Sequence, residues 1–307
     1  METDGAAPID VPVLYPAVVV AVGRADGSPH GADVAITEVT ATDNPAPAEP
    51  WVGVADVATA LDAIERSVRA NPLAAAALVQ LLRVGAGRPA EDGLVLESVV
   101  YSMLQSGPEF ATWRSGRSPS RQLRESHPPV LVERRGEVLQ VTLNRPEVHN
   151  AYNRAMRDAL CEALSVAMID RETVVEITGR GASFCSGGDL TEFGTASDPV
   201  SAHRIRSTRS PARLLAALSP RVRVTLHGAC AGSGIELPAF AGFVSARPDT
   251  RIWLPELRMG LIPGAGGTVS LTRRIGRQRT AWLALTGSTL DASTALGWGL
   301  VDELSGA

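Results

Sequence analysis

The stretch LHGACAGSGIELPAF, residues 226–240, places three glycines, small apolar residues and a serine around a single carboxylate, Glu236. It overlaps the end of RVRVTLHG (221–228), in which apolar and polar residues alternate as they do along a β-strand. A carboxylate in so apolar a segment is paired, favours a helix dipole, or takes part in chemistry. The stretch therefore predicts a turn that leaves a strand and enters a helix, with Glu236 in the first helical turn.

A second glycine-rich turn, GRGASFCSGGDL (179–190), follows another predicted strand, TVVEIT (173–178). Glycines in such turns leave backbone N–H groups unobstructed by a Cβ atom. Two N–H groups from separate turns can converge on one oxygen, which is the requirement of an oxyanion hole. The two turns together predict a site that stabilises negative charge on an oxygen.

The segments around these turns alternate between strand and helix. EVLQVTLN (137–144) has the alternation of a strand, and Asn153 is placed to cap the helix that follows. The apolar stripe expected on that helix comprises Met156, Leu160, Leu164 and Met168. Strand, helix and strand in this order predict a layered α/β fold, which binds ligands at the carboxyl ends of its strands.

The composition limits the classes of function. The 307 residues are 45% hydrophobic and 20% charged, with a net charge of −4, so a large core is possible and a nucleic-acid partner is not indicated. Cys161, Cys185 and Cys230 have no CxxC spacing, which favours a reducing compartment. The apolar run at 11–22 is too short to span a membrane, and no basic residue precedes Arg24. We expect a soluble cytoplasmic protein with no membrane partner.

A polar stretch rich in Arg, Ser and Pro at about 115–128 predicts a linker and divides the chain into residues 1–127 and 128–307. The first part is an Ala-rich extension with helical spacing at 53–70, 71–85 and 93–110, and it contains no recognisable catalytic constellation. A strand-like segment at 34–47 faintly repeats the opening of the second part. The extension is therefore interpreted either as a degenerate copy of that part or as an assembly module.

Five motifs follow one another along the second part of the chain: VTLNRPEVHNAYNRAMRDAL (141–160), ITGRGASFCSGGDL (177–190), HGACAGSGIEL (227–237), WLPELRMGLIPGAGGTVSLTRRIG (253–276) and LTGSTLDASTALGWGLVDEL (285–304). Their order is typical of the crotonase (enoyl-CoA hydratase/isomerase) superfamily, and the sequence resembles the enoyl-CoA hydratases of that superfamily most closely. The resemblance covers about residues 130–304. It implies an α/β, crotonase-like core built as a spiral of ββα units, preceded here by a mainly helical extension.

The resemblance also implies roles for individual residues. The amides of Gly188 and Ser233 match the oxyanion-hole donors of the family, and Glu236 and Glu256 match the two glutamates that hold the added water in its hydratases. Ser233 stands where a glycine is common, and Pro238 follows Glu236 closely. Residues that match the family's substrate- and CoA-binding positions are Arg145, His149, Asn150, Ala151, Asp189 and Leu190.

The function implied by the resemblance is that of an enoyl-CoA hydratase, which adds water to a 2-enoyl-CoA to give a 3-hydroxyacyl-CoA. CoA would arrive as part of the substrate, with no metal or other cofactor, and the protein is expected to be a homo-oligomer, trimer-based. Two alternatives stay open: a double-bond isomerase, and a catalytically weak crotonase-like scaffold subunit. The sequence ends soon after GLVDEL, where relatives continue into further helices, so the extension is expected to cover the site or to serve assembly.

Other interpretations of the motifs carry less weight. GACAG (228–232) has the outline of a nucleophile elbow with Cys230 and the nearby His227, although a cysteine in such a turn is more often a packing residue. GAGGTV (264–269) is excluded as a dinucleotide loop because Pro263 precedes it and no acid follows about 20 residues later. Gly188 and Ser233 could serve only as turn residues, Asp189 as a helix cap and Arg145 as a solvated cation.

Overall fold

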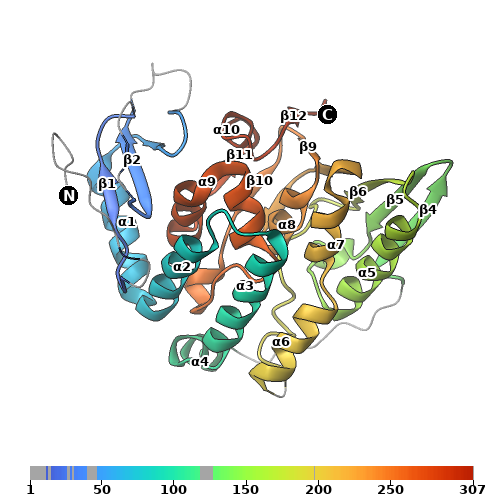
Figure 1. The fold of residues 1–307 in the computed structure, drawn as a ribbon, viewed down its shortest axis with the longest axis horizontal. Helices are drawn as coiled ribbons and strands as arrows, with labels where there is room; N and C mark the ends of the chain where they lie inside the picture. Colours follow the sequence, from blue (N-terminus) through green and yellow to red (C-terminus); the bar gives the residue numbers. More distant parts are fainter. Residues whose placement is uncertain are drawn as a thin grey trace.

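A six-stranded sheet forms the centre of the second part of the chain. The computed structural model describes residues 12, 15–25, 28–29, 31–39, 47–117, 127–196 and 198–306 (Figure 1). In spatial order the strands are β12 (Glu303–Leu304), β9 (Phe243–Ala246), β7 (Val222–Leu226), β6 (Val174–Gly179), β5 (Val138–Leu143) and β4 (Val130–Arg135). All neighbours are parallel except the β4–β5 hairpin, so the predicted α/β organisation is present.

The predicted alternation along these strands matches their burial. In β5 the side chains of Leu139, Val141 and Leu143 are buried, whereas their neighbours in the strand are only partly covered. Val175 and Ile177 of β6 point into the same core. Period-two burial of this kind fixes the register, because a slip by one residue would turn the apolar side chains away from the core.

A smaller sheet in the second part of the chain carries the glycine turn of the opening motif. It consists of β11 (Leu290–Asp291), β10 (Arg251–Trp253) and β8 (Ala229–Ala231). β8 runs parallel to β10 and lies between Gly228 and the helix that bears Glu236. That helix, α8 (Ser233–Glu236), is a single turn, because Pro238 opens the 3-10 turn η3 (Pro238–Phe240) directly after it.

Helices cover the sheets. They are α5 (Arg154–Ile169), α6 (Pro199–Thr208), α7 (Pro211–Leu218), α9 (Gly267–Thr286) and α10 (Ala292–Gly297), with the 3-10 turns η1 (Pro146–Val148), η2 (Ser219–Arg221) and η4 (Glu256–Met259). Asn153 caps α5 by accepting from the amide of Met156 at 2.9 Å, as predicted. Met168 is 43% exposed, so its inclusion in the buried stripe of α5 was wrong; the buried stripe ends at Leu164 and Ala167.

The described residues of the first part of the chain form a three-stranded parallel sheet and four helices. The elements are β1 (Val20–Val22), β2 (Val34–Glu38), β3 (Val52–Val54), α1 (Val57–Ala70), α2 (Pro72–Gly85), α3 (Ala90–Gln105) and α4 (Pro108–Ser115). The predicted helix at 93–110 is two helices, because Gly107 and Pro108 end one and begin the next. The expected linker begins inside α4, and its residues 118–126 lie outside the described part of the chain.

The long helix α9 joins the two parts. Helices α1, α2 and α3 and strand β2 pack on it from the side of the extension, and Figure 1 shows α9 between these elements and the core strands. At its first turn α9 meets α3 and α8, so the N-terminal extension reaches the turn that carries Glu236. This junction is where the candidate site lies.

Candidate active site

A cavity of about 630 Å³ opens between the extension and the core. Its walls come from α3, from the turn that contains Gly188, from α8, from η4 and from residues 264–266. Four of the residues predicted for chemistry line it: Gly188, Ser233, Glu236 and Glu256. The structure thus brings these four positions together, although they lie up to 68 residues apart in the sequence.

Two backbone amides of the segment 265–267 hold the side chain of Glu236. Its side chain is 2% exposed, and its Oε2 accepts hydrogen bonds from the amides of Ala265 at 2.7 Å and Gly267 at 2.9 Å. Burial raises the pKa of Glu236 to about 7, while these amides act in the opposite direction. The carboxylate is therefore held in place and titrates near neutral pH.

Glu256 begins η4 and is also buried, but it is not held in the same way. Its Oε2 has no hydrogen-bond partner among the described residues. Burial raises the pKa of Glu256 well above its usual value, and the charge of Glu236 raises it further. The two acids therefore differ: Glu236 is the one with fixed N–H donors, and Glu256 is the one that more readily keeps its proton.

Gly232 lies where the two acids converge. A Cβ atom on this residue would collide with Oε1 of Glu256 and would lie 3.7 Å from Oε1 of Glu236. Its φ of 48° belongs to the left-handed region, which favours glycine. Gly232 therefore allows both carboxylates to face one point beside the N-terminus of α8.

The two predicted oxyanion-hole amides border the same cavity. The backbone of Tyr152 pairs with the residues on either side of Gly188: its amide donates to the carbonyl of Gly187 and its carbonyl accepts from the amide of Asp189, each at 2.8 Å. The amide of Gly188 takes no part in this pairing. Ser233 is the first residue of α8, where amides have no intrahelical acceptor. Within the described ranges, neither amide donates to a protein acceptor. Both are available to an oxygen in the cavity.

The side chains of Arg145 and Asn150, two of the residues predicted to bind CoA, make hydrogen bonds to protein groups. Arg145 is 2% exposed; its guanidinium donates to the carbonyl of Ala151 and to Asp189 Oδ2 at 3.1 Å. Asn150 is buried, with its Oδ1 accepting from the Arg145 amide at 2.7 Å. The structure therefore places the Arg145 side chain inside the protein rather than on the cavity wall, because these internal acceptors hold it.

The remaining predicted positions lie around this turn. Asp189 lines the cavity and also accepts from the amide of Thr191 at 3.1 Å, as a turn cap does. His149 is exposed, and its Nδ1 lies 3.1 Å from Ser183 Oγ. Leu190 is 39% exposed and borders a neighbouring cavity of about 790 Å³ beside α4.

One residue at the site was missed by the sequence analysis. Glu97, from α3 of the extension, is 2% exposed and lines the cavity beside Glu236. Its carboxylate accepts from the amides of Gly266 at 2.7 Å and Thr268 at 2.9 Å. The only signal in the sequence is an acid within the apolar run GLVLESVV, and that signal does not reveal which distant turn the acid meets.

The alternative nucleophile is not supported. Cys230 is fully buried, its thiol approaches the carbonyl of His227, and burial raises its pKa well above the usual value. Nε2 of His227 lies 3.0 Å from the carbonyl of Gly181 and not beside the thiol. The part of the chain that the structure describes contains no group of three His, Cys, Asp or Glu side chains able to hold a metal ion.

Comparison with known proteins identifies the family of this chain. Residues 133–306 match the family model described as enoyl-CoA hydratase/isomerase. The chain therefore belongs to the enoyl-CoA hydratase/isomerase family and has a crotonase-like α/β core. No helix in the described ranges is both long and apolar enough to cross a membrane.

Three relatives illustrate the range of this family. The chain is 35% identical over 178 residues to a 2,3-dehydroadipyl-CoA hydratase of Escherichia coli, a match that covers 57% of this chain and 68% of the relative. It is 36% identical over 172 residues to a trans-2-decenoyl-[acyl-carrier-protein] isomerase of Streptococcus mutans, covering 53% and 64%. The crystal structure of an enoyl-CoA hydratase from Thermoplasma volcanium matches with a TM-score of 0.52 at 35% identity, covering 58% and 72%. The chain thus spans about two thirds of each relative, and hydratases and isomerases occur among them.

Proposed function

We propose that this protein hydrates 2-enoyl-CoA thioesters to 3-hydroxyacyl-CoA. The observation that carries the proposal is the convergence of Oε1 of Glu236 and Oε1 of Glu256 beside Gly232, in a cavity that the amides of Gly188 and Ser233 also border. Isomerases need only one proton-transferring acid, whereas hydration uses two groups to hold and divide a water molecule. The pair of buried acids therefore favours hydration.

The mechanism begins at the thioester oxygen. When water attacks C3 of the enoyl group, negative charge moves to the oxygen on C1, and the Gly188 and Ser233 amides would stabilise it there. Removing one donor of such a hole typically lowers the rate on the order of 10²–10³-fold. The short helix α8 begins at Ser233, so its backbone dipole adds to the stabilisation.

Each of the two acids would transfer one proton during the addition of water. Glu236, whose Oε2 is occupied by two amides, keeps Oε1 free as the base that removes a proton from the attacking water. Glu256 would deliver a proton to C2, because burial and the charge of Glu236 raise its pKa and so favour its protonated form. General acid–base catalysis of this kind is typically worth about 10²–10⁴-fold.

The proposal includes the expectations that were drawn from the sequence. CoA enters as part of the substrate, no metal or other cofactor takes part, and the protein works as a cytoplasmic homo-oligomer, trimer-based. Sedimentation velocity of the purified protein measures the last point directly. A monomer at assay concentration would contradict it.

The test of the function uses two substrates. With crotonyl-CoA we expect the enoyl-thioester absorbance to fall as water is added, and with a 3-enoyl-CoA we expect no formation of the conjugated 2-enoyl product. Because isomerases occur among the relatives, the specific alternative is that the protein converts the 3-enoyl-CoA to the 2-enoyl product and does not hydrate crotonyl-CoA. A protein that changes neither substrate would support the scaffold interpretation instead.

A further inference from the structure

One face of α3 lies against the turn that enters α9. Gly93, Glu97 and Tyr101 are spaced by four residues, so they share this face. A Cβ atom on Gly93 would meet Val269 at 2.7 Å, and one on Gly264 would collide with the Tyr101 ring. The contact is therefore close along two turns of the helix, with Glu97 at its centre.

Four consecutive amides of that turn are shared between two carboxylates. Ala265 and Gly267 donate to Oε2 of Glu236, whereas Gly266 donates to Oε1 of Glu97 at 2.7 Å. Thr268 donates to Oε2 of Glu97 twice, from its amide at 2.9 Å and from its hydroxyl at 2.6 Å. The amides thus alternate between a residue of the core and a residue of the extension 169–171 positions away.

The turn depends on this arrangement. Gly266 has a φ of 110°, and these amides belong to the start of α9, where the first four N–H groups have no intrahelical acceptor. A Cβ atom on Gly267 would lie 2.7 Å from Cγ of Glu236, so the turn is in contact with the acid that it holds. Movement of Gly266 or Thr268 would therefore displace the two amides that fix Glu236.

The titratable groups that interact with Glu97 come from α8, from η4, from α6 and from α3 itself. Glu236 of α8 repels it, Glu256 of η4 and the Tyr101 phenol complete the acidic side, and Arg206 of α6 is the nearby cation. Burial, with the repulsion from Glu236, raises the pKa of Glu97 to about 8, and its three hydrogen bonds oppose the rise. Both oxygens accept from fixed N–H donors, which is the pattern of a carboxylate that serves the turn.

We infer that Glu97 is a positioning residue: it holds the turn at 265–268 so that two of the turn's amides fix Glu236 with one oxygen free toward the cavity. The inference rests on the proposed function for its catalytic consequence, but not for its structural one. It makes the N-terminal extension a direct part of the active site. Glu97 need not touch the substrate, since both of its oxygens are occupied.

The substitution Glu97→Gln tests the inference. A carboxamide has one acceptor and one donor end, so either Gly266 or Thr268 is left with its amide facing an NH₂ group. We expect kcat for crotonyl-CoA to fall on the order of 10²-fold, the size of effect that misplacement of a catalytic group by about 1 Å produces. KM should stay within about threefold.

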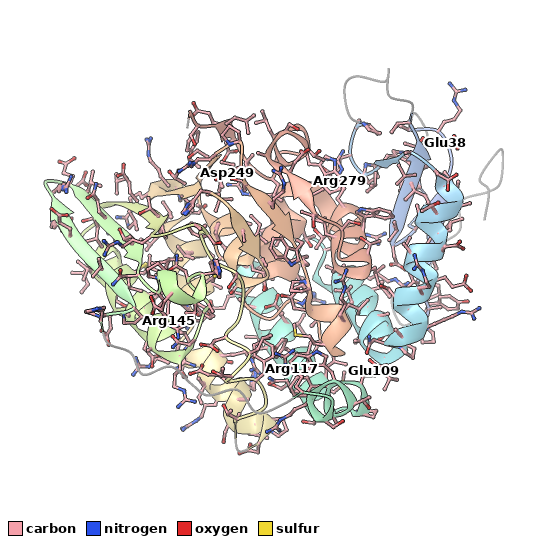
Figure 2. The ribbon with its side chains drawn as sticks, turned by 180° about the vertical axis from the view of Figure 1, so that it is seen from behind. Glu38, Glu109, Arg117, Arg145, Asp249 and Arg279 are labelled. Carbon is pink, nitrogen blue, oxygen red and sulfur yellow. The ribbon has the colours of Figure 1, made fainter. Side chains whose placement is uncertain are left out.

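The matched control is Glu109→Gln. Glu109 belongs to α4 of the same extension (Figure 2), and its carboxylate likewise accepts from two helix-start amides, Leu73 at 2.7 Å and Ala74 at 2.9 Å. It lines neither of the two cavities described above. We expect this variant to keep the kcat of the wild-type protein while amide exchange near residues 73–74 becomes faster.

Hydrogen exchange supplies a readout that does not depend on activity. In Glu97→Gln the amides of 265–268 should exchange about 10- to 100-fold faster, as expected when a buried donor loses its acceptor, and in Glu109→Gln they should not change. If the wild-type protein is inactive on enoyl-CoA, the proposed function fails, and this exchange alone decides whether Glu97 holds the turn. If Glu97→Gln does not fold, Thr268→Val, which removes only the hydroxyl donor, should accelerate exchange about 3- to 10-fold.

Two results would overturn the inference. One is unchanged exchange at 265–268 in Glu97→Gln, whatever its activity. The other is faster exchange at 265–268 in Glu97→Gln combined with a kcat equal to that of an active wild-type protein. The turn would then not position Glu236.

Discussion

At the scale of single residues, the site gathers three buried acids that share one electrostatic environment. Glu236 and Glu97 have pKa values raised to about 7 and about 8, and that of Glu256 is raised as well. An acid whose pKa is higher in the folded protein than in the unfolded chain binds its proton more tightly when folded. Such a group favours folding at low pH, and this contribution is lost as the pH rises through the folded-state pKa.

This linkage predicts the effect of Glu256→Gln on stability. The variant lacks one acid with a raised pKa and the repulsion of that acid with Glu236. Its free energy of unfolding relative to the wild-type protein should therefore increase, by about 1 kcal/mol, as the pH rises above the ordinary range of a glutamate pKa. Urea denaturation at several pH values measures the difference. A difference in the free energy of unfolding that does not change with pH would contradict this prediction. We expect Glu256→Gln to gain stability and lose activity, which is a common trade-off at active sites.

The candidate site residues that the sequence predicts each lie in a short local motif. Glu236, Glu256, Gly188 and Ser233 each lie in a short motif that could be matched by itself, and the structure places all four on one cavity. Glu97 could not be found this way. Its role depends on a helix and a turn that meet only in the folded chain.

At the scale of elements, strands and helices with clear periodicity were predicted and short ones were not. β5 and α5 have the expected alternation and cap, but β8 has three residues and no pattern to detect. α8 is one turn long because Pro238 follows it, and its position is set by β8 and β10 rather than by its own propensity. The turn-forming glycines, in contrast, were visible in the sequence.

A pair of glycine substitutions tests the elements that the site depends on. Gly276 interrupts α9 with φ of 75° and ψ of 162°, and a Cβ atom there would meet the Glu49 carboxylate. Gly276→Ala should therefore destabilise the protein by about 1–3 kcal/mol. Gly85 ends α2 with nothing within 4 Å of an added Cβ, so Gly85→Ala should stabilise it by about 0.4–1 kcal/mol.

Thermal and urea unfolding of both variants measure these effects. Equal changes in stability in Gly276→Ala and Gly85→Ala would show that the backbone conformation of Gly276 is not needed for α9. Loss of stability in Gly85→Ala would contradict the open surroundings seen at that position.

At the scale of the whole molecule, the extension and the core are joined through α9. Arg279 lies on this helix (Figure 2) and is 3% exposed. It donates to the carbonyls of Pro47 at 2.6 Å and Trp51 at 3.2 Å, and its guanidinium lies 5.0 Å from the ring centroid of Trp298. It thus links β3 of the extension to α10 of the core. The sequence indicated two segments with a linker, but not that they share a buried helix, because the contacts join residues more than 200 positions apart.

This junction predicts that the two parts unfold together. In urea, amide exchange in α2 and in β6 should report one common opening free energy, and a shortened chain of residues 128–307 should show no cooperative transition. Exposure of the apolar side of α9 is the physical reason, since α1, α2 and α3 cover it in the full chain. Opening of α2 at low urea with β6 still protected would contradict the prediction.

In the proposed reaction, two acids and two amides act on one enoyl thioester. The most direct measurement is the rate of crotonyl-CoA hydration by the wild-type protein and by the double variant Glu236→Gln/Glu256→Gln, followed by the loss of enoyl-thioester absorbance. We expect hydration by the wild-type protein and a fall of at least about 10⁴-fold in the double variant, to the limit of detection. Hydration that survives the loss of both carboxylates would contradict this expectation.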